Sequence, residues 1–166
     1  ATPAQISPTR FHNSVHNAAA RYWSIGAACT RPYTAISAGP HTFGAGLLET
    51  CAQVLSSDEN ILFVLYDIDA RGPLAAVAPS RGLLSAGLVI GPEPGTQALA
   101  SFDLEFLRQE HFEPSHAQPA NAALVAGNAS EACLPFMEAL ARGGEHQVRC
   151  LAGPGLGLAI SLRQPD

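Results

Sequence analysis

The uninterrupted apolar run at residues 61–66 constrains the fold of this chain more than any other segment. Six apolar residues in a row, bounded by polar sequence, predict a strand that is buried on both faces. Upstream, helical spacing predicts a helix over 42–55 with Thr42 as its cap, and residues 33–38 predict a short strand before it. Strand, helix and buried strand together predict a βαβ unit, which requires a crossover of this length.

The rest of the chain predicts further helices and strands around this unit. Ser7 and Pro8 are typical of a helix start, and the apolar spacing after them predicts a helix over 8–25. Turn-rich segments containing glycine and proline separate the later elements. The remaining predicted elements are strands at 83–90 and 98–106, a helix at 131–142, and strands at 146–151 and 158–162. We therefore expect a single α/β domain over residues 1–166 with a mixed sheet.

The surface of this chain carries few charges. Only 14% of the 166 residues are Asp, Glu, Lys or Arg, against roughly 25% in an average soluble domain. All nine basic residues are Arg and the net charge is −5, which argues against sequence-independent binding of nucleic acid, because such binding needs several phosphate-neutralising cations. We expect part of this weakly charged surface to be covered by another molecule.

Targeting and redox signals favour a cytoplasmic protein. No apolar run approaches the roughly 20 residues that span a bilayer, and no basic segment followed by an apolar one opens the chain. The four cysteines are scattered without a CxxC pair, which favours reduced, buried thiols over a disulfide framework. They are Cys29, Cys51, Cys133 and Cys150. We expect no membrane span.

Two histidines on the predicted first helix form one candidate site. His12 and His16 are four residues apart, so they would share a helix face and could hold a metal ion. The helix lacks the Glu that serves as the base in metalloproteases with this spacing. The other interpretation is that His12, Asn13, His16 and Asn17 form hydrogen bonds inside a packed interface. On that interpretation we expect no metal and no cofactor.

The predicted turn between residues 33–38 and 42–55 is the second candidate site. A strand-to-helix turn presents free N–H groups and carries the nucleophile of many α/β enzymes. Ser37 and Thr42 are the nearest hydroxyls, and His41 could act as a base. No GxSxG motif surrounds them. A structural turn is one interpretation, and a small acyltransferase or hydrolase that uses Ser37, His41 and Thr42 is the alternative.

The N-terminal sequence resembles a known family. The run Ile6-Ser7-Pro8-Thr9-Arg10-Phe11-His12-Asn13-Ser14-Val15-His16-Asn17-Ala18-Ala19-Ala20, continued by Tyr22-Trp23-Ser24-Ile25, is similar to the β-ketoacyl synthase-like N-terminal domain proteins of aryl-polyene and xanthomonadin pigment clusters. The resemblance covers most of residues 6–107. It implies a layered, partial thiolase-like fold, the N-terminal half of a β-ketoacyl synthase, that lacks the first elements of its relatives.

The chain departs from catalytic synthases at the nucleophile. Those enzymes carry a Cys at the strand-to-helix turn, where the helix N-terminus stabilises its thiolate. Here Gly39, Pro40 and His41 occupy that position. Cys29 precedes the predicted strand and Cys51 lies well inside the predicted helix, so we expect neither to reach the site. The two His residues that promote decarboxylation belong to a C-terminal half that this chain is too short to contain.

The resemblance implies a chain-length-factor-type subunit without catalytic residues. Such a subunit pairs with a catalytic β-ketoacyl synthase and shapes the tunnel for the acyl chain held on acyl carrier protein. An obligate interface of this kind buries a weakly charged surface. A homodimer is the other possible assembly. The candidates for the interface or tunnel are His12, Asn13, His16, Asn17 and Phe43. The hydrolase and metal-binding interpretations stay open as alternatives.

Overall fold

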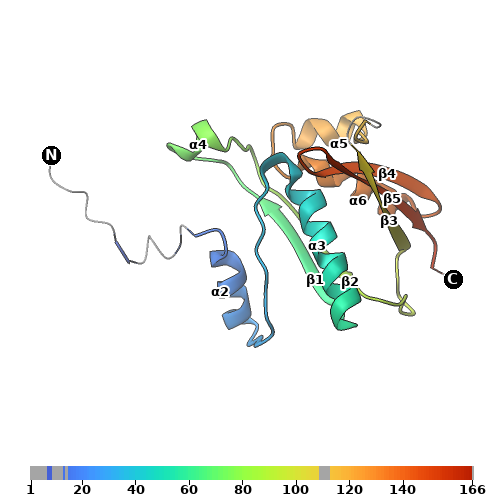
Figure 1. Ribbon diagram of the computed structural model, residues 1–166. Helices are drawn as coiled ribbons and strands as arrows, with labels where there is room; N and C mark the ends of the chain where they lie inside the picture. The colour runs from blue at the N-terminus through green and yellow to red at the C-terminus, as the bar shows by residue number, and fades with distance from the viewer. Residues whose placement is uncertain (1–6, 9–12, 14, 109–112, 166) are drawn as a thin grey trace. The chain divides into compact units, whose positions relative to one another are not determined.

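The computed structural model describes residues 7, 8, 13, 15–108 and 113–165, and the chain divides into two compact units, Ala1–Ser37 and Ala38–Asp166. Figure 1 shows the helices and strands with their labels. The elements are α2 (Ala18–Gly26), η1 (Gly39–His41), α3 (Thr42–Ser57), β1 (Ile61–Asp67), α4 (Leu74–Val77), β2 (Leu84–Ile90), β3 (Ser101–Arg108), α5 (Pro119–Leu124), η3 (Glu131–Cys133), α6 (Leu134–Arg142), β4 (His146–Gly153) and β5 (Leu156–Arg163).

The first unit contains a shorter helix than the sequence predicts. Helix α2 begins at Ala18, and residues 15–17 form a bend and turn before it, so the continuous helix expected over 8–25 is wrong at this point. Asn13, His16 and Asn17 all have low helix propensity, because their polar side chains favour caps and turns. The alanines that follow them propagate a helix well, which explains the start at Ala18.

The strand expected over residues 33–38 is not formed, and this corrects the predicted βαβ unit. These residues have no regular secondary structure, and the boundary between the two compact units falls within them, after Ser37. A strand exists only when the backbone groups of a neighbouring strand satisfy its own. The composition of 33–38 suits a strand, but no described strand pairs with it.

Helix α3 is the central helix of the second unit. Its residues Phe43, Leu47, Thr50 and Val54 are buried at the spacing of one helical face. The helix ends at Ser57, because Asp58 adopts a left-handed conformation (φ 56°) and its N–H donates to the carbonyl of Val54 at 2.9 Å. The predicted helix over 42–55 is confirmed to within two residues.

Two antiparallel sheets flank α3. Strands β1 and β2 form a hairpin in which Ile61 pairs with Ile90 and Asp67 with Leu84. Strands β3, β5 and β4 form a three-stranded sheet in that order. Every strand pair among the described residues is antiparallel. The later strands and the last long helix lie close to their predicted ranges, and the α/β class is confirmed. The described sheets are antiparallel rather than the expected mixed sheet, because residues 33–38 form no strand parallel to β1. The short helices α4 and α5 were not expected from the sequence.

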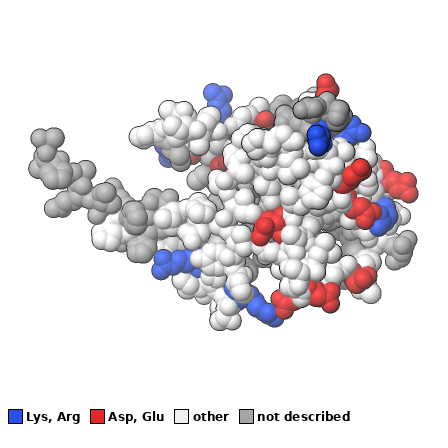
Figure 2. All heavy atoms as spheres, viewed as in Figure 1, with Lys and Arg blue, Asp and Glu red and all other residues white. Residues whose placement is uncertain are grey.

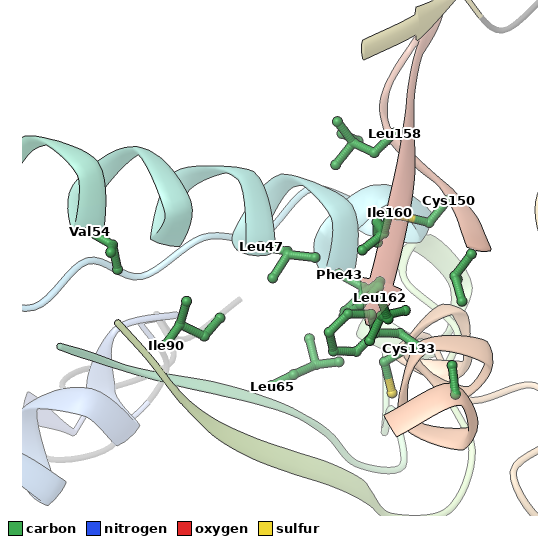
Figure 3. Packing of buried hydrophobic residues seen from close by; sticks show 14 residues of the cluster. Phe43, Leu47, Val54, Leu65, Ile90, Cys133, Cys150, Leu158, Ile160 and Leu162 are labelled. Carbon is green, nitrogen blue, oxygen red and sulfur yellow. The ribbon is translucent and has the colours of Figure 1, made fainter. Parts of the chain in front are cut away.

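The hydrophobic core of the second unit lies between the two sheets and around α3. Figure 3 shows Leu47 and Val54 directed toward the hairpin residues Leu65 and Ile90. At the other end of the helix, the Phe43 ring lies 6.5 Å from that of Phe63 and 5.7 Å from that of Phe136, measured between centroids. Strand β5 adds Leu158, Ile160 and Leu162 to the same core. One helix therefore joins both sheets into one hydrophobic core.

The outer faces of the two sheets differ in chemistry. The exposed face of the three-stranded sheet is polar, and Asp103 on β3 forms an ion pair with Arg163 on β5. On β1, by contrast, Leu62, Val64 and Tyr66 alternate with the inward residues, and each is about half exposed. The expectation that 61–66 is buried on both faces is therefore wrong for the described residues, because α3 covers only one face of the hairpin.

Two glycines let α3 approach both sheets closely. A Cβ atom at Gly44 would lie 2.3 Å from the carbonyl oxygen of Leu151 on β4, and a Cβ at Gly46 would lie 2.9 Å from the ring of Phe63 on β1. The first obstacle is backbone, which cannot move without displacing the strand. The second is the end of a side chain, which can rotate away.

We predict that Gly44→Ala and Gly46→Ala differ sharply in stability. Alanine gains about 1 kcal/mol of helix propensity over glycine at both positions. At Gly44 the clash with β4 exceeds this gain, and we expect a net loss of about 3 kcal/mol in the free energy of unfolding. At Gly46 we expect a change within about 1 kcal/mol. Urea denaturation measures both; equal effects would show that β4 does not approach α3 as described.

A buried polar cluster joins the loop before β2 to the loop before η3. We call it the clamp, formed by Ser80, Arg81, Gly127, Asn128 and Ser130. The Asn128 amide donates to the carbonyl of Arg81 at 2.8 Å, and its oxygen accepts the N–H of Ser130 at 3.0 Å. The Ser80 hydroxyl accepts the N–H of residue 129 at 3.1 Å, and the Arg81 N–H donates to Gly127. Asn128 is only 2% exposed.

Removal of the Asn128 side chain should destabilise the protein far more than removal of an exposed amide. Asn128→Ala leaves two buried backbone groups without partners, and we expect a loss of about 2 kcal/mol in unfolding free energy. Asn121→Ala is the matched control, since that exposed amide donates to Glu138 at 2.8 Å; its loss should stay below about 0.5 kcal/mol. Similar losses in both variants would contradict the buried clamp.

Candidate functional site

The turn that leads into α3 is the first candidate site. Gly39 has φ +56°, which glycine adopts without strain, and Gly39, Pro40 and His41 form the 3-10 turn η1. The hydroxyl of Thr42 donates to the carbonyl of Gly39 at 2.7 Å and accepts the N–H of Ala38 at 3.0 Å. The Thr42 hydroxyl therefore stabilises the turn. A nucleophilic hydroxyl would have to donate its proton to a base, but the Thr42 hydroxyl donates its proton to the Gly39 carbonyl.

Strand β4 lies across the first turn of α3. Its residues pack against both η1 and α3, and the Leu151 carbonyl reaches the backbone of Gly44 so closely that no side chain fits between them. A helix N-terminus stabilises an anion when its free N–H groups are accessible to it. Here strand backbone lies beside the first turn of the helix. Strand β4 therefore packs against one side of the first turn of α3, whereas Gly39 and Pro40 of the turn before it are exposed.

The three residues of the hydrolase interpretation are divided between the two compact units. His41 and Thr42 belong to the second unit, whereas Ser37 ends the first, Ala1–Ser37. His41 precedes α3 without a side-chain capping bond. No hydrogen bond links His41 to Thr42 through their side chains among the described residues. The described geometry thus gives no nucleophile–base pair at this turn.

The candidates in the first unit have separate environments. His12 lies outside the described residues. The Asn13 amide oxygen accepts a hydrogen bond from the Tyr22 hydroxyl at 2.8 Å, which ties the turn to α2. His16 is exposed in the turn, and Asn17 precedes α2 without a side-chain capping bond. Among the residues that the structure describes, no group of three or more His, Cys, Asp or Glu side chains is placed to hold a metal ion.

Phe43, the remaining candidate, lies in the core of the second unit. It is 2% exposed and packs between the rings of Phe63 and Phe136. Within the described residues its contacts are those of a core side chain, and its place beside a tunnel stays a prediction.

Burial makes three cysteine thiols poor nucleophiles. Removal from water raises the pKa of Cys51, Cys133 and Cys150 from 9.0 to about 11. Desolvation disfavours the thiolate, which is the nucleophilic form of cysteine. All four cysteines are free thiols, and Cys29 is partly exposed. None of the three thiols in the second unit has the lowered pKa that a catalytic cysteine needs.

A comparison with known protein families identifies the family to which this chain belongs. The family described as "Beta-ketoacyl synthase, N-terminal domain" matches residues 1–148. The chain belongs to this family. Its helices and antiparallel sheets agree with a partial thiolase-like ketoacyl synthase domain. No curated protein and no solved structure matches the chain. In the described part of this synthase-family chain, no helix is both long enough and apolar enough to cross a membrane.

Two features of this synthase-family domain were not found from the sequence. One is the close packing of β4 against the first turn of α3, for which the small residue Gly44 was the only signal. The other is the clamp, whose Ser80 and Asn128 are 48 positions apart. At the end of β1, Asp67 and Asp69 accept the N–H groups of Ile68 at 2.7 Å and of Gly82 at 2.5 Å, so both carboxylates support the loop backbone.

The cysteines should differ in reactivity in the folded domain. At pH 8 we expect one thiol per chain, Cys29, to react rapidly with Ellman's reagent. Cys133 and Cys150 are buried, and the raised pKa of the partly exposed Cys51 keeps it almost wholly protonated. Cys29→Ser should remove the fast phase, and denaturant should release the remaining thiols. Rapid labelling of Cys51 in the native protein would contradict this assignment.

The same pKa values set the pH dependence of stability. The folded pKa of these thiols lies above the unfolded pKa, so the stabilisation is complete below pH 9 and is lost as the pH rises through about 11. We expect the urea midpoint to fall between pH 9 and 11. The fall should be smaller in Cys150→Ala, when each variant is compared with its own value at pH 8. An equal fall in this variant and in the wild type would assign the effect to other groups.

Proposed function

We propose that this chain is a non-catalytic, chain-length-factor-type subunit of a β-ketoacyl synthase. It pairs with a catalytic synthase subunit and acts on acyl chains carried by acyl carrier protein in polyene-like or fatty-acid-like chain elongation. The observation that carries this proposal is the turn before α3. The resemblance aligns Gly39, Pro40 and His41 with the nucleophile position of catalytic synthases, and this turn contains no cysteine.

The chemistry of chain elongation explains why a partner is needed. A synthase first transfers the acyl chain to a thiolate and then condenses it with a second unit. The turn offers no thiol, and the Thr42 hydroxyl is engaged on both sides. The three cysteines of the second unit are held as neutral thiols by burial. The covalent step therefore belongs to the partner's cysteine, and this chain contributes surface and shape.

The surface of the chain supports a subunit role. The outer face of β1 exposes apolar side chains, whereas the outer face of β3 and β5 carries an ion pair. Obligate interfaces are large and apolar, like a domain core cut in half. The four free thiols agree with a reducing compartment, and we place the protein in the cytoplasm with its carrier-protein substrates. His12, Asn13, His16 and Asn17 are the proposed interface residues of the first unit, and Phe43 the proposed tunnel residue.

Co-expression tests this proposal. The tagged chain and the β-ketoacyl synthase encoded nearest to it should co-purify. Malonyl- and acyl-carrier-protein substrates should be elongated by the pair and not by this chain alone. Indifference of both product length and rate to the presence of this chain, together with failure to co-purify, would overturn the proposal.

Substitution at the turn should leave the activity of the pair unchanged. We expect His41→Ala to retain the elongation rate within about twofold, because no step passes through its imidazole. Substitution of the partner's nucleophilic cysteine by Ala should abolish elongation. A loss of more than tenfold with His41→Ala in a folded, assembled pair, or labelling of this chain by a fluorophosphonate probe, would favour the hydrolase interpretation instead.

A further inference from the structure

A cavity of about 330 Å³ lies between α6, β4 and the segment of residues 115–118. We call it the α6 cavity, and Figure 1 shows α6 beside β4, against which it packs. None of its lining residues belongs to the turn before α3. Ligand sites in proteins usually have volumes of about 300–1,000 Å³. The α6 cavity lies at the lower end of this range, so it suits a small ligand.

The segment that forms one wall of the α6 cavity is tied at both ends. At one end, the Ser115 N–H donates to the carbonyl of Arg149 on β4 at 2.8 Å, and the Ser115 hydroxyl accepts the Arg149 N–H at 2.9 Å. At the other end, the Gln118 N–H donates to both carboxylate oxygens of Glu138 on α6, at 3.0 and 3.1 Å. The backbone at His116 is held between these two anchors, and a wall that is already ordered lowers the entropic cost of binding a ligand.

Glu138 and Arg142 line the cavity one helical turn apart, but they do not pair with each other. Opposite charges at this spacing on a helix usually attract. Here the Glu138 carboxylate is occupied, because it accepts the Gln118 N–H and the side-chain amide of Asn121 at 2.8 Å. The Arg142 guanidinium has no hydrogen bond or ion pair with any residue that the structure describes. Its N–H groups are therefore free for a ligand.

Two further side chains add donors to the same cavity. The His116 imidazole can donate in either protonation state, and it has no partner in the described part of the chain. The Gln147 amide oxygen accepts from the Arg149 guanidinium at 3.2 Å, which leaves the amide nitrogen to donate elsewhere. Glu138 is the only carboxylate among the described lining residues, and it already accepts hydrogen bonds. The cavity thus has more unpaired donors than acceptors, a pattern that favours an anion.

The donors of the α6 cavity are not explained by a generally basic surface. On the face that Figure 2 shows, most of the surface is uncharged and the Arg side chains lie in separate spots. Pro135 and Val148, which are buried, give the lining an apolar part. A guanidinium matches the geometry of carboxylate and phosphate groups, and apolar lining favours a ligand with an aliphatic part.

We propose that the α6 cavity binds a small organic anion, a carboxylate or a phosphate monoester. Its charged group pairs with Arg142 and His116, and its aliphatic part contacts Val148. A metal cation is the alternative ligand, but no group of three or more His, Cys, Asp or Glu side chains in the described ranges is placed to hold one. This binding site does not depend on the proposed subunit role.

NMR titration of the full ¹⁵N-labelled chain tests the site. The probes are butyrate and methyl phosphate, with sodium chloride at equal ionic strength as the control. We expect at least one probe to shift the amide signals of residues 115–118 and 138–148 saturably, with a Kd in the millimolar range, and chloride to shift none of them. Tighter binding of butyrate would identify the charged group as a carboxylate, and tighter binding of methyl phosphate would identify it as a phosphate. No saturable shift of these signals with either probe would overturn the proposal.

Two matched substitutions separate the cavity from the overall charge of the chain. Arg142→Gln and Arg71→Gln each remove the charge of an exposed Arg that has no described partner, and Arg71 lies outside the lining. We expect the probe's Kd to rise at least about tenfold in Arg142→Gln and less than about twofold in Arg71→Gln. His116→Ala should raise it about threefold. Urea denaturation should show that all three variants are folded. Unchanged binding in Arg142→Gln, or an equal loss in Arg71→Gln, would show that the cavity is not the binding site.

Discussion

The close contact of α3 with β4 governs the second unit. Because Gly44 has no side chain, the helix can lie against strand backbone at Leu151, while its neighbouring face packs on the β1–β2 hairpin. Each sheet alone would be marginal, since small antiparallel sheets need a covered apolar face. The helix supplies that cover to both. The same contact brings β4 beside the first turn of α3, so one packing constraint shapes both the fold and the candidate site.

The elements that sequence reasoning predicted correctly are those whose signal is local. The helix over 42–55 has its own apolar period, and the later strands are bounded by glycine and proline. A third error, the early start of the first helix, is local, because residues of low helix propensity precede Ala18. The other two errors depend on distant partners. Residues 33–38 have the composition of a strand but no described neighbour, and residues 61–66 are covered on one face only. Composition predicts which residues are able to form a strand or to be buried. It does not predict whether the fold supplies a neighbouring strand to pair with them or a helix to cover them.

The candidate site was likewise predictable from the sequence only in part. The absence of a cysteine at Gly39, Pro40 and His41 follows directly from the sequence once the resemblance supplies the position. The close packing of β4 against α3 does not follow from the sequence, because Gly44 and Leu151 are separated by more than a hundred residues and only the fold places them in contact. The clamp was not predicted for the same reason. Nothing in the sequence distinguishes Ser80 and Asn128 from other polar residues, and only the fold buries them side by side in one hydrogen-bonded cluster.

The loop of residues 68–83 between β1 and β2, here called the arm, is tied at its base, and this bears on how fast a complex could form through it. A loop that orders only on contact slows association and loses conformational entropy when it binds. Here Pro73 and Pro79 restrict the backbone on both sides of α4, and the hydrogen bonds at Ala70 and Gly82 already join the two sides. The arm is thus preorganised. Encounter with a partner would proceed as docking between rigid bodies, limited by diffusion and orientation rather than by folding.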